Sequence, residues 1–378
     1  MRRLQILHVI GGGEFGGAER QILNLASAID QQKVFLHVCC LFTAPFLQVA
    51  EEHGLSAVAV PMKHKLDFSV AGRLYSLIRE KHIDLVHTHG VRANLLGRMA
   101  AKLSGKPVIT TVHSRLAFDY PGLLSRTVNS WTERATRGLT DHFIAVSRGL
   151  REALLNEGVP DKKITVIYNG LDVDEFKPPE ERGRFRRSLK LADDVPLVAV
   201  IGRMHPVKGH RFFLEAAVEV LASKPEVRFL LIGSGPERQV LQELVGELKI
   251  TDRVIFTGFI EDIVSVLADI DVLAIPSLSE GLPVTAIEAM SSFVPVVATS
   301  VGGLPEVIQD CRTGLLVNPG SAEALARGIL WVLNNRAEAQ EMARRGYATV
   351  ENNFSARSMA RGTEGVYQKI FRSYVKED

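Results

Sequence analysis

Short apolar runs rich in β-branched residues alternate with helical patterns along almost the whole chain. In the first half, the strand-like runs cover residues 4–10, 34–42, 83–89, 107–113, 142–147 and 164–169. Between them, stretches such as AERQILNLASAI carry apolar residues at the i, i+3, i+4 and i+7 spacing of an amphipathic helix. Continuous apolar strands separated by helices are typical of parallel sheets covered on both faces. The pattern therefore predicts an α/β fold.

The second half of the chain repeats this plan. Strands are predicted at 195–202, 227–233, 253–258, 271–276, 294–300 and 313–317, with helices around 208–223, 236–248, 283–292 and 321–334. The charged stretch 172–194 contains Pro178 and Pro179 and no strand, which is typical of a connection between domains. We expect two Rossmann-like domains, 1–172 and 173–354. Residues 355–378 are expected to form a helix that crosses back to the N-terminal domain.

Charge and cysteine content narrow the class of protein. The net charge of +2 over 378 residues argues against a nucleic-acid partner. Residues 1–175 carry 21 basic and 17 acidic side chains, and the remainder carries 24 and 26, so only the front half is basic. Three cysteines cannot form a disulfide framework, which favours buried thiols in a reducing cytoplasm. The N-terminus lacks a cleavage site and is interpreted as mature protein, and no apolar run is long enough for a membrane span.

A glycine-rich loop follows the first predicted strand, and Gly11, Gly13 and Gly16 fit the pattern G-x-G-x-x-G. A dinucleotide site would need a carboxylate at the end of the second strand, but that strand ends in CCLFT. Two interpretations stay open. The loop either turns backbone amides toward an anion or a sugar hydroxyl, or is a tight turn without a ligand.

Two cations follow the first strand of the second half. This strand ends at Gly202, and Arg203 and Lys208 flank the start of the next helix. Open parallel sheets bind ligands at the carboxyl ends of their strands, so these cations are well placed for a diphosphate. The alternative is a pair of solvated surface charges.

Paired carboxylates occur in SLSEGLPVTAIEAM, where Glu280 and Glu288 are eight residues apart and Pro283 suits a first helical turn. The spacing fits a ligand shared between a loop and a helix. The alternative is a capping glutamate followed by a solvated helix glutamate.

The ordered set of motifs resembles glycosyltransferase family 4, a family of retaining enzymes with the GT-B fold. The motifs span the chain: GGAER (16–20), HTHG (87–90), TVHS (111–114), AVSRGLRE (145–152), VIYNGLD (166–172), GRMHPVKG (202–209), FTGFIED (256–262), SEGLP (279–283), PVVATSVGGLPEVI (295–308) and TGLLV (313–317). The resemblance implies two Rossmann-like domains facing across a deep cleft. One departure is Ser292-Phe293, where the family often has a small pair ending in glycine.

The resemblance also implies roles for individual residues. A nucleotide-sugar donor is expected on the second domain, with its diphosphate held near Gly202 by Arg203 and Lys208. Two cations can neutralise a departing nucleoside diphosphate in place of a metal ion. Glu288 is expected on the ribose, and Glu280, with the amides of Gly281 and Leu282, on the transferred sugar. His113 is expected near that sugar. The other expected contributors, on the N-terminal side, are Gly16, Gly17 and Asn169.

The predicted activity is metal-independent retaining transfer from a nucleotide sugar to a glycan, a lipid-linked or a small-molecule acceptor, in cell-envelope polysaccharide or glycoconjugate synthesis. UDP, GDP and ADP donors stay open, and no cofactor is expected. The alternatives are a GT-B nucleotide-sugar hydrolase or epimerase, and a non-catalytic nucleotide-sugar-binding protein. His87 and His89 share a strand face as metal ligands would, but no carboxylate or cysteine completes a site, so no metal is expected.

A basic and aromatic segment covers residues 114–139. It contains Arg115, Arg126, Arg134 and Arg137 interleaved with Phe118, Tyr120, Leu123, Leu124 and Trp131. Such a segment can lie on an anionic membrane surface, which would place the protein at the inner face of the membrane. The alternative is an ordinary helix that packs Trp131 into the N-terminal domain.

Overall fold

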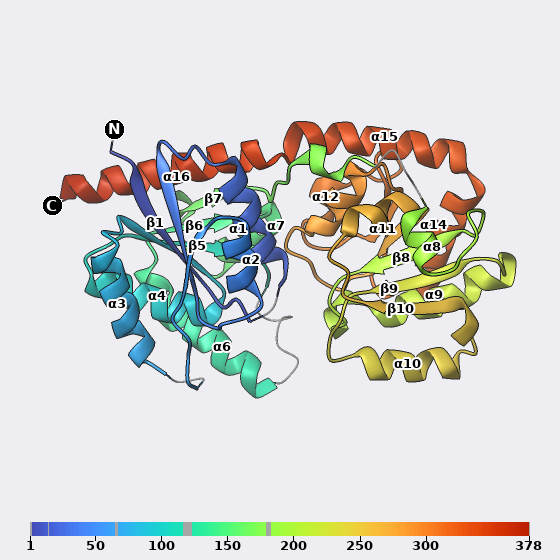
Figure 1. Cartoon of the computed structure of the whole chain (residues 1–378), viewed down its shortest axis with the longest axis horizontal. Coiled ribbons are helices and arrows are strands. Elements are labelled where there is room, and N and C mark those ends of the chain that lie inside the picture. Colours follow the sequence, from blue (N-terminus) through green and yellow to red (C-terminus); the bar gives the residue numbers. More distant parts are fainter. Residues whose placement is uncertain (1, 14, 65–66, 116–122, 179–182, 378) are drawn as a thin grey trace. The chain divides into compact units, whose positions relative to one another are not determined.

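The chain forms two α/β units in the computed structural model, which describes residues 2–13, 15–64, 67–115, 123–178 and 183–377 (Figure 1). Unit 1 comprises Met1–Gly170 together with Ala356–Asp378, and unit 2 comprises Leu171–Ser355. The last helix of the chain therefore belongs to the same unit as the first strand.

Unit 1 contains a seven-stranded parallel sheet in the order β3-β2-β1-β4-β5-β6-β7. Its strands are β1 (Leu4–Ile10), β2 (Val34–Cys40), β3 (Ser56–Ala59), β4 (Leu85–His89), β5 (Val108–Val112), β6 (His142–Ala145) and β7 (Ile164–Val166). The helices are α1 (Gly17–Ala28), α2 (Phe46–Glu52), α3 (Ser69–Glu80), α4 (Val91–Leu103), α6 (Leu123–Thr136), α7 (Arg148–Asn156) and α16 (Ala356–Glu377).

Strand alternation sends the apolar side chains of this sheet to its two opposite faces. Leu7 and Val9 of β1 join the core beneath α3 and α4. Leu4 and Ile6 join the opposite core, which also contains Tyr367 of α16 and residues of α1. Helices α1 and α16 therefore cover one face of the sheet and α3 and α4 cover the other (Figure 1).

Unit 2 contains a six-stranded parallel sheet in the order β10-β9-β8-β11-β12-β13. Its strands are β8 (Leu197–Ile201), β9 (Arg228–Ile232), β10 (Val254–Gly258), β11 (Val272–Ile275), β12 (Val296–Thr299) and β13 (Leu315–Val317). The helices are α8 (Arg184–Ser188), α9 (His210–Ser223), α10 (Arg238–Glu247), α11 (Ile263–Asp269), α12 (Val284–Ser291), α13 (Leu304–Val307), α14 (Ala322–Asn334) and α15 (Arg336–Asn353).

The stretch expected to connect the domains packs within unit 2. The Asp269 carboxylate accepts hydrogen bonds from the Gly183 amide at 2.6 Å and the Arg186 amide at 3.0 Å. The Arg186 side chain also donates to Asp271 at 2.9 Å. Pro179 lies outside the described residues. Gly183 and Arg186 are thus anchored to the end of α11 and to the residue just before β11.

The expectation that the thiols are buried is wrong for one of the three cysteines. Cys311 is exposed, whereas Cys39 and Cys40 are buried as expected. Phe293, the departure from the family pattern, occupies a left-handed position (φ 58°) after α12 and stacks on Tyr347 at a ring-centroid distance of 4.4 Å. This conformation explains why glycine suits the position, because a bulky side chain is strained there.

Candidate active site

A lysine and a glutamate form an ion pair at the carboxyl edge of the unit 2 sheet. Lys208 ends the 3-10 turn after β8, and its Nζ lies 2.7 Å from the Glu280 Oε1. The Ser277 hydroxyl donates to the same carboxylate oxygen at 2.6 Å. The Glu280 side chain is only 8% exposed, and the Lys208 side chain is 32% exposed. The sequence indicated both charged residues but gave no signal for Ser277.

The loop that carries Glu280 is tied to its neighbours by backbone interactions. The Leu278 amide donates to the Val207 carbonyl at 2.7 Å, and the Thr299 hydroxyl donates to the Ser277 carbonyl at 2.6 Å. Gly302 lies so close that a Cβ atom there would be 1.8 Å from the Glu280 carbonyl oxygen. The end of β12 and the turn after it therefore set the position of the Glu280 backbone.

Glycines also let backbone segments meet next to Arg203. A Cβ atom on Gly233 would lie 2.1 Å from the Gly202 carbonyl oxygen, and one on Gly235 would lie 2.4 Å from the Met204 carbonyl oxygen. Both glycines have positive φ values, 132° and 157°. The loops after β8 and β9 are consequently in contact, with the exposed Arg203 side chain at their edge.

The second carboxylate, Glu288, is buried in α12 and is 5% exposed. The alternative of a solvated helix glutamate is therefore wrong. Gly281 and Leu282 are buried between Glu280 and the start of α12 at Val284. Pro283 is the N-cap of this helix rather than its first helical residue.

The candidate residues of unit 1 are distributed over several elements. Gly16 is the N-cap of α1 and its amide donates to the Glu19 carboxylate at 3.1 Å, an interaction that was not predicted from the sequence. Gly17 is the first residue of α1. Asn169 is buried after β7 and is 4% exposed. His113 directly follows β5, and its Nε2 lies 3.0 Å from the Nδ1 of His89.

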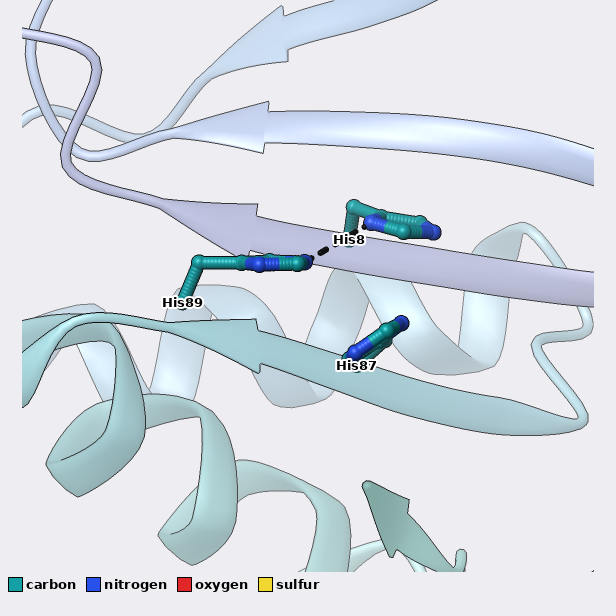
Figure 2. A group of neighbouring side chains, drawn as sticks. All are labelled: His8, His87 and His89. Atoms are coloured by element: carbon teal, nitrogen blue, oxygen red, sulfur yellow. Dashed lines mark hydrogen bonds between the residues drawn. The ribbon is translucent and has the colours of Figure 1, made fainter. Parts of the chain in front are cut away.

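His89 belongs to a buried group of three histidines (Figure 2). His8 comes from β1, and His87 and His89 come from the neighbouring strand β4. The Nδ1 of His8 lies 2.9 Å from the Nε2 of His89. The three rings offer nitrogen atoms within 4.8 Å of one another, a spacing that suits a metal ion. Every nitrogen of these rings already has a hydrogen-bond partner, so a metal would have to displace such bonds.

Burial keeps the rings of this group neutral. It lowers the pKa of His8 to about 3 and that of His113 to about 4. The pKa values of His87 and His89 lie well below the ordinary value, because burial is reinforced by the neighbouring histidines. Each ring therefore has one N–H donor and one lone-pair acceptor at neutral pH.

These depressed pKa values predict acid sensitivity of unit 1. Below about pH 6.5 the histidines of the unfolded chain bind protons, whereas buried His8, His87 and His89 of the folded chain stay neutral. The free energy of unfolding therefore decreases as the pH is lowered. At pH 5 the loss approaches about 2 kcal/mol for each ring. Urea unfolding between pH 7.5 and 5 measures it. Replacing His8 by asparagine should reduce the slope of stability against pH by about one proton. An unchanged slope in the His8 variant would contradict the assignment.

The segment expected at a membrane surface includes α6. Trp131 is 72% exposed and Val128 is 52% exposed, so the alternative of Trp131 packed into unit 1 is wrong. The opposite side of the helix packs inward through Glu133, whose carboxylate accepts from Arg98 at 2.6 Å. Phe118 and Tyr120 lie outside the described residues. Within the described ranges, no helix is both long and apolar enough to cross a bilayer.

A cavity of about 470 Å³ lies elsewhere in unit 2. Its lining includes Arg186, Asp271, Phe293 and Pro295, at the amino ends of β11 and β12. The candidate residues at the opposite, carboxyl edge of the sheet do not contribute to it.

Known proteins resemble the chain over nearly its whole length. Two family models match, "Glycosyltransferase Family 4" over residues 15–175 and "Glycosyl transferases group 1" over residues 181–349. A 2-deoxystreptamine glucosyltransferase from Streptomyces kanamyceticus is 31% identical over 303 residues, covering 76% of this chain and 78% of that protein. The Escherichia coli UDP-Gal:alpha-D-GlcNAc-diphosphoundecaprenol alpha-1,3-galactosyltransferase is 26% identical and covers 88% of this chain and 89% of its own length. HepE from Anabaena, solved with UDP and glucose, has a TM-score of 0.86 at 22% identity over 97% of this chain and 100% of that one.

The two parallel-sheet units and these neighbours define a glycosyltransferase with the GT-B fold. The chain belongs to glycosyltransferase family 4. The resemblance found in the sequence is thereby confirmed, and the protein is an enzyme that transfers a sugar.

Proposed function

We propose that the protein is a metal-independent, retaining hexosyltransferase that uses a nucleotide-sugar donor. The observation that carries this proposal is the group of Lys208, Glu280 and Ser277 at the carboxyl edge of the unit 2 sheet, where such sheets bind ligands. A cation held there can stabilise the negative charge that develops on a departing nucleoside diphosphate.

The remaining candidate residues take roles around this group. Arg203 joins Lys208 on the diphosphate near Gly202, and Glu288 holds the ribose. Glu280 binds hydroxyls of the transferred sugar together with the backbone at Gly281 and Leu282. Because Lys208 pairs with Glu280 in the structure, a bound diphosphate shares this lysine with the carboxylate. Retention then proceeds on one face of the sugar, with the leaving phosphate helping to deprotonate the acceptor.

We propose UDP as the nucleotide of the donor, because the 26% identical relative is named for UDP-Gal. The named acceptors of the relatives differ, from 2-deoxystreptamine to a diphosphoundecaprenol-linked sugar. The acceptor is therefore proposed only as a glycan, a lipid-linked or a small molecule, in synthesis of a cell-envelope polysaccharide or glycoconjugate.

A panel of UDP, GDP and ADP sugars in EDTA tests the donor and the metal independence together. At 100-fold excess over Kd the preferred donor should stabilise its unit by about 2.7 kcal/mol, or roughly 5–10 °C in a thermal-shift measurement. Arg203→Ala should weaken this shift, and NMR of the product should find the anomeric configuration of the donor. An inverted product would contradict retention. Release of free sugar without transfer to an acceptor would favour the hydrolase alternative. Binding of the nucleotide sugar without any turnover would favour a non-catalytic binding protein.

We further propose that α6 contacts an anionic membrane surface. The exposed Trp131 and Val128 lie one helical turn apart, beside the exposed Arg134. Flotation with anionic vesicles at low salt tests the contact, and Trp131→Ala should reduce the bound fraction. A protein that stays at the bottom of the gradient in the presence of anionic vesicles would contradict the proposed membrane contact.

A further inference from the structure

One face of the unit 1 sheet carries polar side chains at its carboxyl end. Strand alternation places His8, His87 and His89 on the face where Ile6 and Leu85 are packed. Thr111 of the next strand lies opposite His89 in the register and is 2% exposed. Helix α16 covers this face and brings Tyr367, which is fully buried.

These side chains form one continuous series of hydrogen bonds, which we call the histidine chain. In order, its members are Thr111, His87, Tyr367, His8, His89 and His113. The link between His8 and His89 is drawn in Figure 2.

The hydroxyl of Tyr367 joins the two halves of the histidine chain. It lies 2.7 Å from the Nδ1 of His87 and 3.0 Å from the Nε2 of His8. The Nε2 of His87 lies 2.7 Å from the Thr111 hydroxyl, and the distances from His8 to His89 and from His89 to His113 are 2.9 and 3.0 Å. All five distances are normal for hydrogen bonds.

A count of protons restricts the tautomers of the four rings. Each hydrogen bond holds one proton, each neutral ring has one, and the Tyr367 hydroxyl has one. If Tyr367 donates to His8, then His8 donates to His89 and His89 donates to His113, each through Nδ1–H. His87 must then donate its own Nδ1–H to the Tyr367 oxygen. The opposite direction gives four Nε2–H rings, so the four histidines share one tautomer.

Thr111 selects between these two directions. In the Nδ1–H direction its hydroxyl donates to the Nε2 of His87. In the opposite direction Thr111 accepts that bond, and its own buried hydrogen has no other acceptor among the hydrogen bonds of the described residues. A buried donor without an acceptor costs about 1–3 kcal/mol. The half-buried His113, at the other end, can find a partner in solvent or in a ligand.

We infer that the histidine chain fixes His113 as the Nδ1–H tautomer and that Tyr367 is the positioning residue that transmits this choice. His113 then presents an N–H donor to an oxygen atom of a ligand, and it does so without a charge. The inference rests on the proposed function only in assigning His113 a substrate oxygen to bind.

Long-range ¹H–¹⁵N correlation spectra of histidine-labelled protein at pH 7.5 test the inference directly. His8, His87, His89 and His113 should all be Nδ1–H tautomers, which is the less common form of free histidine. This measurement needs no variant and no substrate. A single Nε2–H ring among the four would overturn the inference.

Tyr367→Phe keeps the buried ring and removes the hydroxyl that links His8 to His87. The Nε2–H form should then appear at His8, His89 and His113 in equal proportion, while His87 keeps its Nδ1–H form through Thr111. Tyr374→Phe is the matched control, because it makes the same change on the same helix outside the histidine chain. Unchanged tautomers in Tyr367→Phe would show that Tyr367 only packs.

A transfer assay on the same proteins separates this inference from the proposed function. Tyr367→Phe should lower kcat/KM for the donor about 3–10-fold, and Tyr374→Phe should leave it unchanged. The expected tautomers in a protein without transferase activity would overturn the proposed function alone. Full transfer activity with mixed tautomers would overturn the inference alone.

Discussion

Replacing Lys208 by alanine should lower kcat/KM for the nucleotide-sugar donor by about 10²–10³-fold, the loss that follows removal of one preorganised group facing developing charge. Lys208 lies 2.7 Å from Glu280 at the carboxyl edge of the sheet, so its charge is held in place before a donor binds. The cost in stability should be smaller, about 1–3 kcal/mol, because Glu280 keeps its hydrogen bond from Ser277. Steady-state kinetics and urea unfolding measure the two effects separately.

Two further variants identify the origin of this loss. Lys177→Ala also removes an ion pair in unit 2, with Asp174, but at an exposed position, and it should leave kcat/KM unchanged. Glu280→Gln keeps a similar shape and removes the charge that pairs with Lys208. If Lys208 acts only by holding Glu280, the double variant should be no worse than Glu280→Gln alone. A further loss in the double variant supports a direct role of Lys208 on the diphosphate.

Gly302→Ala should destabilise unit 2 by about 3 kcal/mol or more and abolish transfer. The added Cβ would lie 1.8 Å from the Glu280 carbonyl oxygen and 2.7 Å from its carbonyl carbon. Gly302 also has a φ of 55°, a conformation that is unfavourable for alanine. Relief of the clash requires the backbone of Glu280 or of the turn after β12 to move, which displaces the carboxylate. Urea unfolding and activity at saturating donor measure the two consequences.

Gly246→Ala is the matched control for this substitution. Gly246 is an exposed residue of α10 in the same unit, and a Cβ atom there meets no heavy atom within 4 Å. Alanine should stabilise this helix by about 0.5–1 kcal/mol. Equal stabilities of the Gly302 and Gly246 variants would contradict the close approach of Gly302 to Glu280.

Hydrophobic patterning predicted most of the secondary structure. The run at 4–10 coincides with β1, and the run at 195–202 contains β8, because fully buried strands are continuously apolar. The short edge strand β3 was missed, since its exposed and partly buried residues give no apolar run. Helix α15 was also missed, since its sequence is rich in charged residues and few of its side chains are buried.

The candidate site of unit 2 was only partly accessible from the sequence. Lys208 and Glu280 are 72 residues apart, but both follow strands of one parallel sheet, and the carboxyl ends of such strands share an edge. The parallel topology of the sheet therefore indicated that Lys208 and Glu280 lie near each other. Their direct ion pair, the Ser277 hydroxyl and the approach of Gly302 depend on loop conformations that no periodicity encodes.

The α/β class, the order of the strands along the chain and the family could all be predicted from the amino-acid sequence alone. These properties follow from local periodicity and from short motifs, which are visible without any long-range contact. The hydrogen-bond partners of the buried polar groups, in contrast, depend on how distant segments pack together. His87 and Tyr367 are 280 residues apart, and they meet because α16 packs on the sheet of unit 1. A buried ring must find its hydrogen bonds among whatever the fold places beside it, and this is a property of packing rather than of any segment.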